Sequence, residues 1–137
     1  MLRSVVLFKD IPADEIFHVA QITEEKRIAA AEALYNEGDP GDSLYIVVDG
    51  SVRVHIGSQE LAVFKKGDAL GEMALFDSLP RSATATALQD TTLLRISREQ
   101  FFDVMTTRME IMQSIVRTLS LRVRVANEQV AELMAQA

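Results

Sequence analysis

The stretch of sequence that decides the fold runs from residue 67 to residue 84 and reads GDALGEMALFDSLPRSAT. Gly71 permits a tight bend, because glycine adopts positive φ values at no steric cost. Glu72 then opens a single short helical turn, and the free N–H groups at the start of such a turn attract an anion. Pro80 returns the chain and places Arg81 beside that turn. An arginine that faces several free amides makes a phosphate-binding pocket.

Glu72 leaves two interpretations of this stretch open. A carboxylate is unusual in a pocket built only for anions, but it accepts hydrogen bonds from a hydroxyl group such as that of a ribose. In the alternative, Glu72 merely forms an ion pair with Arg81 inside a loop, since short motifs often match without the function. Only the first interpretation predicts a ligand that carries both a phosphate and a hydroxyl group.

Short apolar runs separated by glycine turns surround this stretch, from about residue 26 to residue 96. Residues 44–48 predict a buried strand, and Asp49-Gly50 after them is typical of a hairpin turn. Val52, Val54 and Ile56 alternate with polar residues, which predicts a strand with one buried face. Many short strands at regular spacing indicate an antiparallel β-roll, which is a jelly-roll-like barrel.

Helices are predicted at both ends, over residues 2–25 and 98–137. The segment from residue 10 to residue 15 has an early proline and acids in its first turn, as helix starts do. Ser97 and Thr107 each begin a capping box, S/T-x-x-E/Q, so we expect a short helix from about residue 98 to 105 and a long one from about 108. The sequence therefore predicts an α+β fold in a single domain, residues 1–137, with a β-roll over residues 26–96.

The long helix carries a heptad pattern. The two core positions of this heptad are occupied by Val116, Val123 and Val130 and by Leu119, Ala126 and Leu133. β-branched residues at one position with mostly leucine at the other favour a parallel two-stranded coiled coil, so we expect a homodimer. The alternative is a helix that packs on its own barrel through a second stripe, formed by Ile111, Ile115, Leu121 and Val125. Both contacts can coexist.

Composition excludes several classes of protein. The 137 residues include no cysteine, which excludes disulfides, thiolate zinc sites and a cysteine nucleophile. Neither His18 nor His55 has a partner histidine at metal-ligand spacing, so we expect no metal and no catalytic residues. The net charge of −6 argues against a nucleic-acid-binding surface. The apolar runs are too short to span a membrane, which predicts a cytoplasmic protein with no membrane partner.

Three segments together resemble a known family. Residues 37–47 read EGDPGDSLYIV, and residues 71–75 and 80–84 read GEMAL and PRSAT. In order and spacing they are similar to the cyclic-nucleotide-binding domain of the bacterial catabolite activator protein, of the regulatory subunits of cAMP-dependent protein kinase and of cyclic-nucleotide-gated channels. The resemblance covers nearly the whole chain. Two positions depart from the family pattern: Ala31 replaces a frequent glycine, and Leu70 replaces a frequent aromatic residue.

The resemblance implies a phosphate-binding cassette over residues 71–84 and a role for two of its side chains. It implies that Glu72 binds the ribose 2′-hydroxyl and that Arg81 pairs with the cyclic phosphate. The ligand would be cAMP or cGMP, with cAMP favoured, and Asn127 on the long helix can read a purine edge. Two roles remain open for Arg122 and Arg124: contact with the base, or a position on a solvated helix face. The predicted ligand-binding residues are Gly71, Glu72, Met73, Ala74, Arg81, Ser82, Ala83, Val54, Leu61 and Asn127.

These observations favour a regulatory sensor that binds a cyclic nucleotide, performs no catalysis and signals by movement of its C-terminal helix. Two alternatives remain: a degenerate domain of the same fold that only dimerises, and a small cupin-type jelly-roll enzyme, which would need a histidine-rich metal site. No helix-turn-helix follows the long helix, so we expect no DNA binding by these residues. The sequence leaves open whether the sensor controls an effector domain outside this chain.

Overall fold

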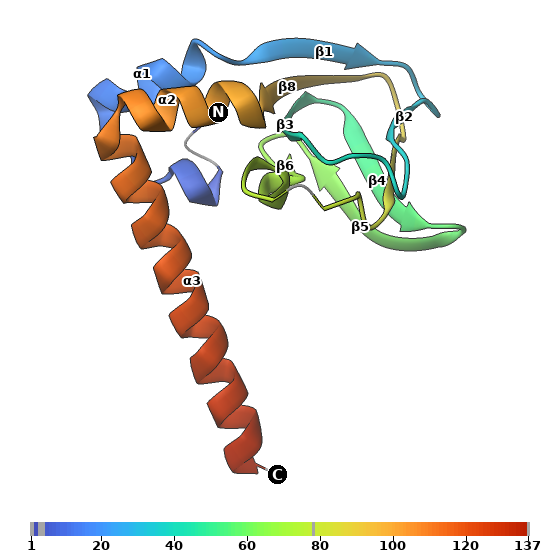
Figure 1. Cartoon of the computed structure of the whole chain (residues 1–137). Coiled ribbons are helices and arrows are strands. Elements are labelled where there is room, and N and C mark those ends of the chain that lie inside the picture. Colours follow the sequence, from blue (N-terminus) through green and yellow to red (C-terminus); the bar gives the residue numbers. More distant parts are fainter. Residues whose placement is uncertain (1, 3–4, 78, 137) are drawn as a thin grey trace.

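The computed structural model describes residues 2, 5–77 and 79–136, which form two four-stranded antiparallel sheets with helices at both ends (Figure 1). This architecture confirms the predicted fold class. The 3-10 helices are η2 (Val6–Phe8) and η3 (Glu72–Leu75), and the α-helices are α1 (Ala13–Ala20), α2 (Arg98–Thr107) and α3 (Met109–Gln136). The strands are β1 (Glu24–Ile28), β2 (Ala33–Tyr35), β3 (Ser43–Asp49), β4 (Ser51–Ile56), β5 (Gln59–Lys65), β6 (Ala69–Leu70), β7 (Thr84–Ala87) and β8 (Thr91–Ser97).

The two sheets have the strand orders β1-β8-β3-β6 and β2-β7-β4-β5. They close on a shared apolar cluster that includes Val47 and Leu93 from the first sheet and Val52 and Ala85 from the second. A separate cluster joins the first sheet to the helices, and its fully buried members include Leu44, Ile96, Phe8, Phe101 and Ile111. The roll therefore has one core between its sheets and another beneath its helices.

The predicted hairpin at Asp49-Gly50 is wrong, because β3 and β4 belong to different sheets. Gly50 has a φ of 98°, and a Cβ there would lie 2.5 Å from the Thr91 hydroxyl oxygen at the start of β8. A turn does occur at this position as predicted, but it leads the chain from one sheet to the other. The turn at Gly57 does connect a hairpin, since Ile56 of β4 pairs with Gln59 of β5.

The N-terminal segment is less helical than predicted. Of the expected helices over residues 2–25, the described residues form η2 and α1, and β1 already begins at Glu24 by pairing with β8; residues 1, 3 and 4 lie outside the description. Pro12 explains the break, because it lacks an N–H group and disfavours helix in the residue before it. It occupies the N-cap of α1.

The two capping boxes had different outcomes. Ser97 caps α2 as predicted, with its hydroxyl accepting a hydrogen bond from the Gln100 N–H at 3.3 Å. Thr107 does not begin the long helix, because it is the last residue of α2 and its hydroxyl donates to the Asp103 carbonyl at 2.8 Å. The bidentate bonds of Arg108 to Glu15, at 2.6 and 2.7 Å, fix this α2–α3 junction to α1.

Only the first half of α3 packs on the rest of the chain. Its buried residues are Ile111, Ser114, Ile115 and Thr118, whereas every residue from 123 to 136 is exposed. Leu121 and Val125, which were expected to continue the inner stripe, are 53% and 51% exposed. Figure 1 shows this second half extending away from the sheets.

Candidate functional site

A pocket of about 510 Å³ lies between the second sheet and the loop that carries η3. One side is formed by residues 71–74 and 79–83, and the other includes Tyr35, Val54 and Phe64. The first side is backbone-rich and carries an arginine, while the second is mostly apolar. Such a pocket can hold a ligand with a charged end and a flat apolar part.

Gly71 shapes the turn as the sequence predicts. Its φ of 76° lies in the left-handed region, which side chains other than glycine rarely adopt. A Cβ at this position would clash with Nη1 of Arg81 and lie 3.1 Å from the Ser43 carbonyl oxygen. Glycine is therefore needed twice, for the backbone conformation and for the close approach of the arginine.

Arg81 is buried beside this turn, with 9% of the residue exposed. Its backbone is held by Gly38 and Asp39, each through one hydrogen bond of 2.8 Å. Nη2 of the guanidinium donates to the Ser43 carbonyl at 2.8 Å, and Nε is buried without an acceptor among the described residues. Burying a cation with an unsatisfied donor costs free energy, unless a bound anion neutralises the charge and accepts the free hydrogen bond.

Free backbone amides surround the arginine. The N–H groups of Glu72 and Met73, at the start of η3, and those of Ser82 and Ala83 find no acceptor among the described residues. Ala74 differs, because its N–H already donates to the Gly71 carbonyl at 3.0 Å. Amides of this kind next to a guanidinium make a binding site for an anion with several oxygen atoms.

The nearby carboxylates each have a partner other than Arg81. Asp42 accepts from the Ser43 hydroxyl at 2.9 Å and lies 3.8 Å from Arg95. Asp39 accepts from the Asn36 N–H at 2.9 Å, and Asp77 accepts from the Leu79 N–H at 3.3 Å. Among the described residues, no carboxylate lies within ion-pair distance of Arg81.

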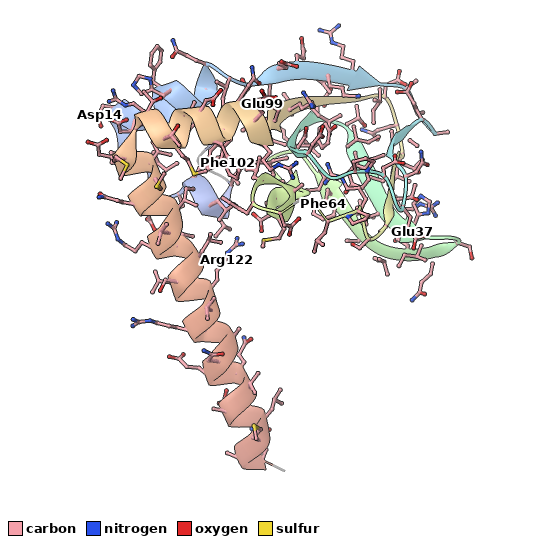
Figure 2. The ribbon with its side chains drawn as sticks, viewed as in Figure 1. Asp14, Glu37, Phe64, Glu99, Phe102 and Arg122 are labelled. Carbon is pink, nitrogen blue, oxygen red and sulfur yellow. The ribbon has the colours of Figure 1, made fainter. Side chains whose placement is uncertain are left out.

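Glu72 forms its ion pair with Arg122 of α3, not with Arg81. The Glu72 Oε1 atom accepts from Nη1 of Arg122 at 2.9 Å, and Arg122 extends from α3 in Figure 2. The alternative in which Glu72 and Arg81 neutralise each other is therefore wrong. From the sequence, Arg122 could either contact the base or lie on a solvated face of the helix. Its ion pair with Glu72 excludes the second role.

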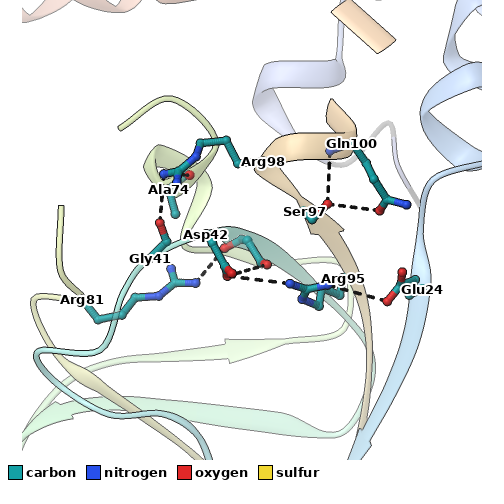
Figure 3. Close-up of polar contacts among 10 residues, drawn as sticks. Glu24, Gly41, Asp42, Ala74, Arg81, Arg95, Ser97, Arg98 and Gln100 are labelled. Carbon is teal, nitrogen blue, oxygen red and sulfur yellow. Dashed lines mark hydrogen bonds and ion pairs between the residues drawn. The ribbon is translucent and has the colours of Figure 1, made fainter. Parts of the chain in front are cut away.

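Arg98, the first residue of α2, anchors the cassette through hydrogen bonds from its side chain. Its Nη1 donates to the carbonyls of Gly41 at 3.2 Å and Asp77. Gly41 lies between Arg98 and Arg81 (Figure 3). The sequence analysis did not identify Arg98. A cation in the first turn of a helix interacts unfavourably with the helix dipole, so its presence there indicates a contact with another part of the chain.

Eight of the ten predicted ligand-binding residues line the pocket: Gly71, Glu72, Met73, Ala74, Arg81, Ser82, Ala83 and Val54. Leu61 does not, because Ala62 and Phe64 of the same strand line the pocket and successive side chains of a strand lie on opposite faces. Val54 pairs with Ala62 and the next residue of β4 pairs with Glu60, so Leu61 is unpaired at a bulge, and it is 51% exposed. Asn127 does not either, since it lies on the exposed half of α3. Ala62, Phe64 and Tyr35 line the pocket and were missed.

Neither a membrane-spanning helix nor a metal-binding cluster occurs in the described part of the chain. No helix there is long and apolar enough to cross a membrane. The same residues contain no group of three or more histidine, cysteine, aspartate or glutamate side chains arranged to hold a metal ion.

The chain is similar to curated proteins from two organisms. The "Cyclic AMP receptor protein" of Thermus thermophilus is 31% identical over 131 residues, which is 92% of this chain and 61% of that protein. The cGMP-dependent protein kinase of Toxoplasma gondii is 46% identical over 98 residues, which is 72% of this chain and 10% of the kinase. This chain thus spans about three-fifths of the receptor and a small part of the kinase.

A solved structure matches along the whole fold. The N-terminal domain of a transcriptional regulator from Streptomyces coelicolor A3(2) superposes with a TM-score of 0.90 and 32% identity, covering 94% of each chain. The model of the family "Cyclic nucleotide-binding domain" matches residues 25–108, which include both sheets except the first residue of β1, and the entire η3 cassette. The chain therefore belongs to the cyclic nucleotide-binding domain family.

Proposed function

We propose that this chain is a regulatory module that binds a cyclic nucleotide monophosphate beside η3 and catalyses no reaction. The observation that carries the proposal is Arg81, a buried guanidinium with no carboxylate partner among the described residues and with a free Nε donor. A cyclic phosphate supplies one negative charge and oxygen acceptors for this group and for the amides of residues 72, 73, 82 and 83.

The other parts of a nucleotide match the remaining surfaces of the pocket. The Glu72 carboxylate can accept a hydrogen bond from a ribose 2′-hydroxyl, because only its Oε1 is engaged by Arg122. Val54, Phe64 and Leu70 offer apolar surface for a purine. A domain that only dimerised would gain no stability from a buried Arg81 that has no carboxylate partner among the described residues and an unsatisfied Nε.

Within this proposal cAMP is favoured over cGMP. The receptor that matches 92% of this chain is named for cyclic AMP, while the cGMP-dependent kinase matches a shorter part at higher identity. Ser82 is exposed at the rim of the pocket, so its hydroxyl can contact either base.

Calorimetric titration with cAMP and cGMP, side by side, tests this choice. We expect both to bind, with cAMP binding more tightly. Tighter binding of cGMP would reverse the assignment of the base, and the absence of heat with either ligand would refute the function.

We further propose that ligand binding is transmitted to α3. Arg122 joins this helix to Glu72, which lines the pocket. A ligand shifts a conformational equilibrium only by its different affinity for the two states. A hydroxyl that shares the Glu72 carboxylate with Arg122 supplies such a difference. Hydrogen exchange in α3 should therefore change on saturation with cAMP, and in Arg122→Gln this change should be lost.

The exposed heptad valines of α3 support a homodimer. Val116, Val123 and Val130 occupy one heptad position and are 59%, 59% and 54% exposed. We expect Val123→Glu to weaken the dimer in sedimentation experiments, because it places an unpaired charge in the helix interface. Leu121→Glu is the matched control, since Leu121 is also exposed but lies off this stripe. A parent protein that stays monomeric at high concentration would refute the coiled coil.

A further inference from the structure

The guanidinium of Arg81 lies against an aromatic side chain that the sequence analysis did not select. Its central carbon is 4.2 Å from the centroid of the Tyr35 ring, which is within the range of a cation–π contact. A second ring, that of Tyr45, lies 5.9 Å from the same carbon. Tyr35 comes from the short strand β2 and also lines the pocket.

Whether Arg81 has a carboxylate or an aromatic ring as its neighbour determines how readily it binds an anion. A carboxylate paired with Arg81 would have to be displaced before a phosphate could bind. An aromatic face carries no net charge and attracts the cation through its quadrupole, so it can stay in place while the edge of the guanidinium binds the ligand. Asp39, Asp42 and Asp77 are all engaged with other groups, as described above.

We propose that Tyr35 is a positioning residue for phosphate binding, whose ring holds the plane of the Arg81 guanidinium so that its Nε edge stays free for the ligand. This inference rests on the proposed function. Three contacts define the orientation: the Ser43 carbonyl binds Nη2 at 2.8 Å, the glycine at position 71 gives Nη1 its space, and the central carbon lies over the Tyr35 ring.

The ring acts through its face and not through a charged oxygen. Burial raises the pKa of the Tyr35 phenol, against the opposing effect of the Arg81 charge. The phenol is therefore neutral under physiological conditions and supplies no counter-ion. No hydrogen bond of the phenol oxygen is found among the described residues, so phenylalanine should replace tyrosine with little loss.

The test combines calorimetry with NMR of the arginine side chain. The variants are Tyr35→Leu, which removes the ring, and Tyr35→Phe, which keeps it. Preorganised binding groups avoid the entropic cost of ordering, so we expect Tyr35→Leu to weaken cAMP binding about tenfold and Tyr35→Phe less than about twofold. The Nε–H resonance of Arg81 should carry a ring-current shift and slow exchange in the parent and in Tyr35→Phe, and should lose both in Tyr35→Leu.

Phe64→Leu is the matched control, because Phe64 lines the same pocket but makes no aromatic contact with Arg81 among the described residues. It should leave the Arg81 resonance unchanged, whatever it does to affinity. If Tyr35→Leu fails to fold, Tyr35→Met replaces it. Affinity and resonance in the ring-free variant equal to those of the parent would overturn the inference. A parent that binds no cyclic nucleotide would instead refute the proposed function, and the two failures are thereby distinguished.

Discussion

Replacing Arg81 with methionine should abolish most ligand binding while leaving the fold intact. Loss of the guanidinium leaves the phosphate of a ligand with backbone amides alone, in a pocket that is partly closed to water. Removing one member of a buried charge pair costs about 2–5 kcal/mol, which is about 30-fold to several-thousand-fold in affinity. Arg81→Lys should recover only part of this loss, because an ammonium group lacks the planar fork of donors.

The same substitution should cost little stability in the absence of ligand. The unliganded protein buries a cation with no carboxylate partner among the described residues, and replacing a buried charge by an apolar side chain is often neutral. Methionine also fills the space of the arginine stem and can contact the Tyr35 ring through sulfur. We therefore expect the melting temperature of unliganded Arg81→Met to stay within about 3 °C of that of the parent.

Thermal unfolding with and without cAMP measures both effects. At a ligand concentration of 100 times the parent Kd, binding stabilises the parent by about 2.7 kcal/mol, or about 9 °C for a chain of this length. A variant with 100-fold weaker affinity gains only about 0.4 kcal/mol, or 1–2 °C. Arg117→Met, which removes one exposed charge from α3, should keep the full shift. A full shift in Arg81→Met would refute the assignment of the phosphate site.

Three further predictions concern single positions. Ala31 has a φ of 69°, a strain of about 1–2 kcal/mol for any residue but glycine; Ala31→Gly should therefore raise the melting temperature by about 2–4 °C after the larger chain entropy of glycine is subtracted, and an unchanged or lower value in thermal unfolding would contradict this. A 2′-deoxy cyclic nucleotide should bind the parent about 10- to 100-fold more weakly than cAMP, from the loss of a bond to a charged acceptor, and Glu72→Gln should show a much smaller difference in the same titrations; equal losses would exclude Glu72 as the ribose contact. The hydrogen bonds from Arg108 lower the pKa of Glu15 below its ordinary value of 4.5, so their stabilisation is present above that pH and disappears as the pH falls through the folded-state pKa. Melting temperatures should thus fall more steeply with acid in the parent than in Glu15→Gln, and parallel curves would exclude the pair.

The cassette could be predicted from the sequence because its parts lie close together in the chain. Gly71, Glu72 and Arg81 fall within one stretch, where a positive-φ glycine and a returning proline determine the local geometry. The structure places all three on the same pocket. Turn and capping chemistry are local in the same sense, which is why the starts of η3 and α2 were also predicted correctly.

Contacts between distant segments could not be predicted in this way. Tyr35 and Arg98 approach Arg81 and the cassette from β2 and α2, and no periodicity relates these positions. Leu61 was assigned to the pocket, but Ala62 and Phe64 of the same strand line it, so Leu61 lies on the opposite face and is 51% exposed. The pattern around Asp49-Gly50 showed strand, turn and strand, yet not that the strands join different sheets.

Glu72 links the two ends of the proposed mechanism, because one carboxylate serves both the pocket and α3. Its bond to Arg122 holds the helix at the point where α3 leaves the body of the protein. Beyond that point lie the exposed valines expected to pair two chains. If occupancy of the pocket changes the position of α3 and α3 also forms the dimer, thermodynamic linkage makes the effect reciprocal. Dimerisation must then change the affinity for the nucleotide by the same factor by which the nucleotide changes the dimerisation constant, so affinity should depend on protein concentration in the parent and not in a monomeric variant.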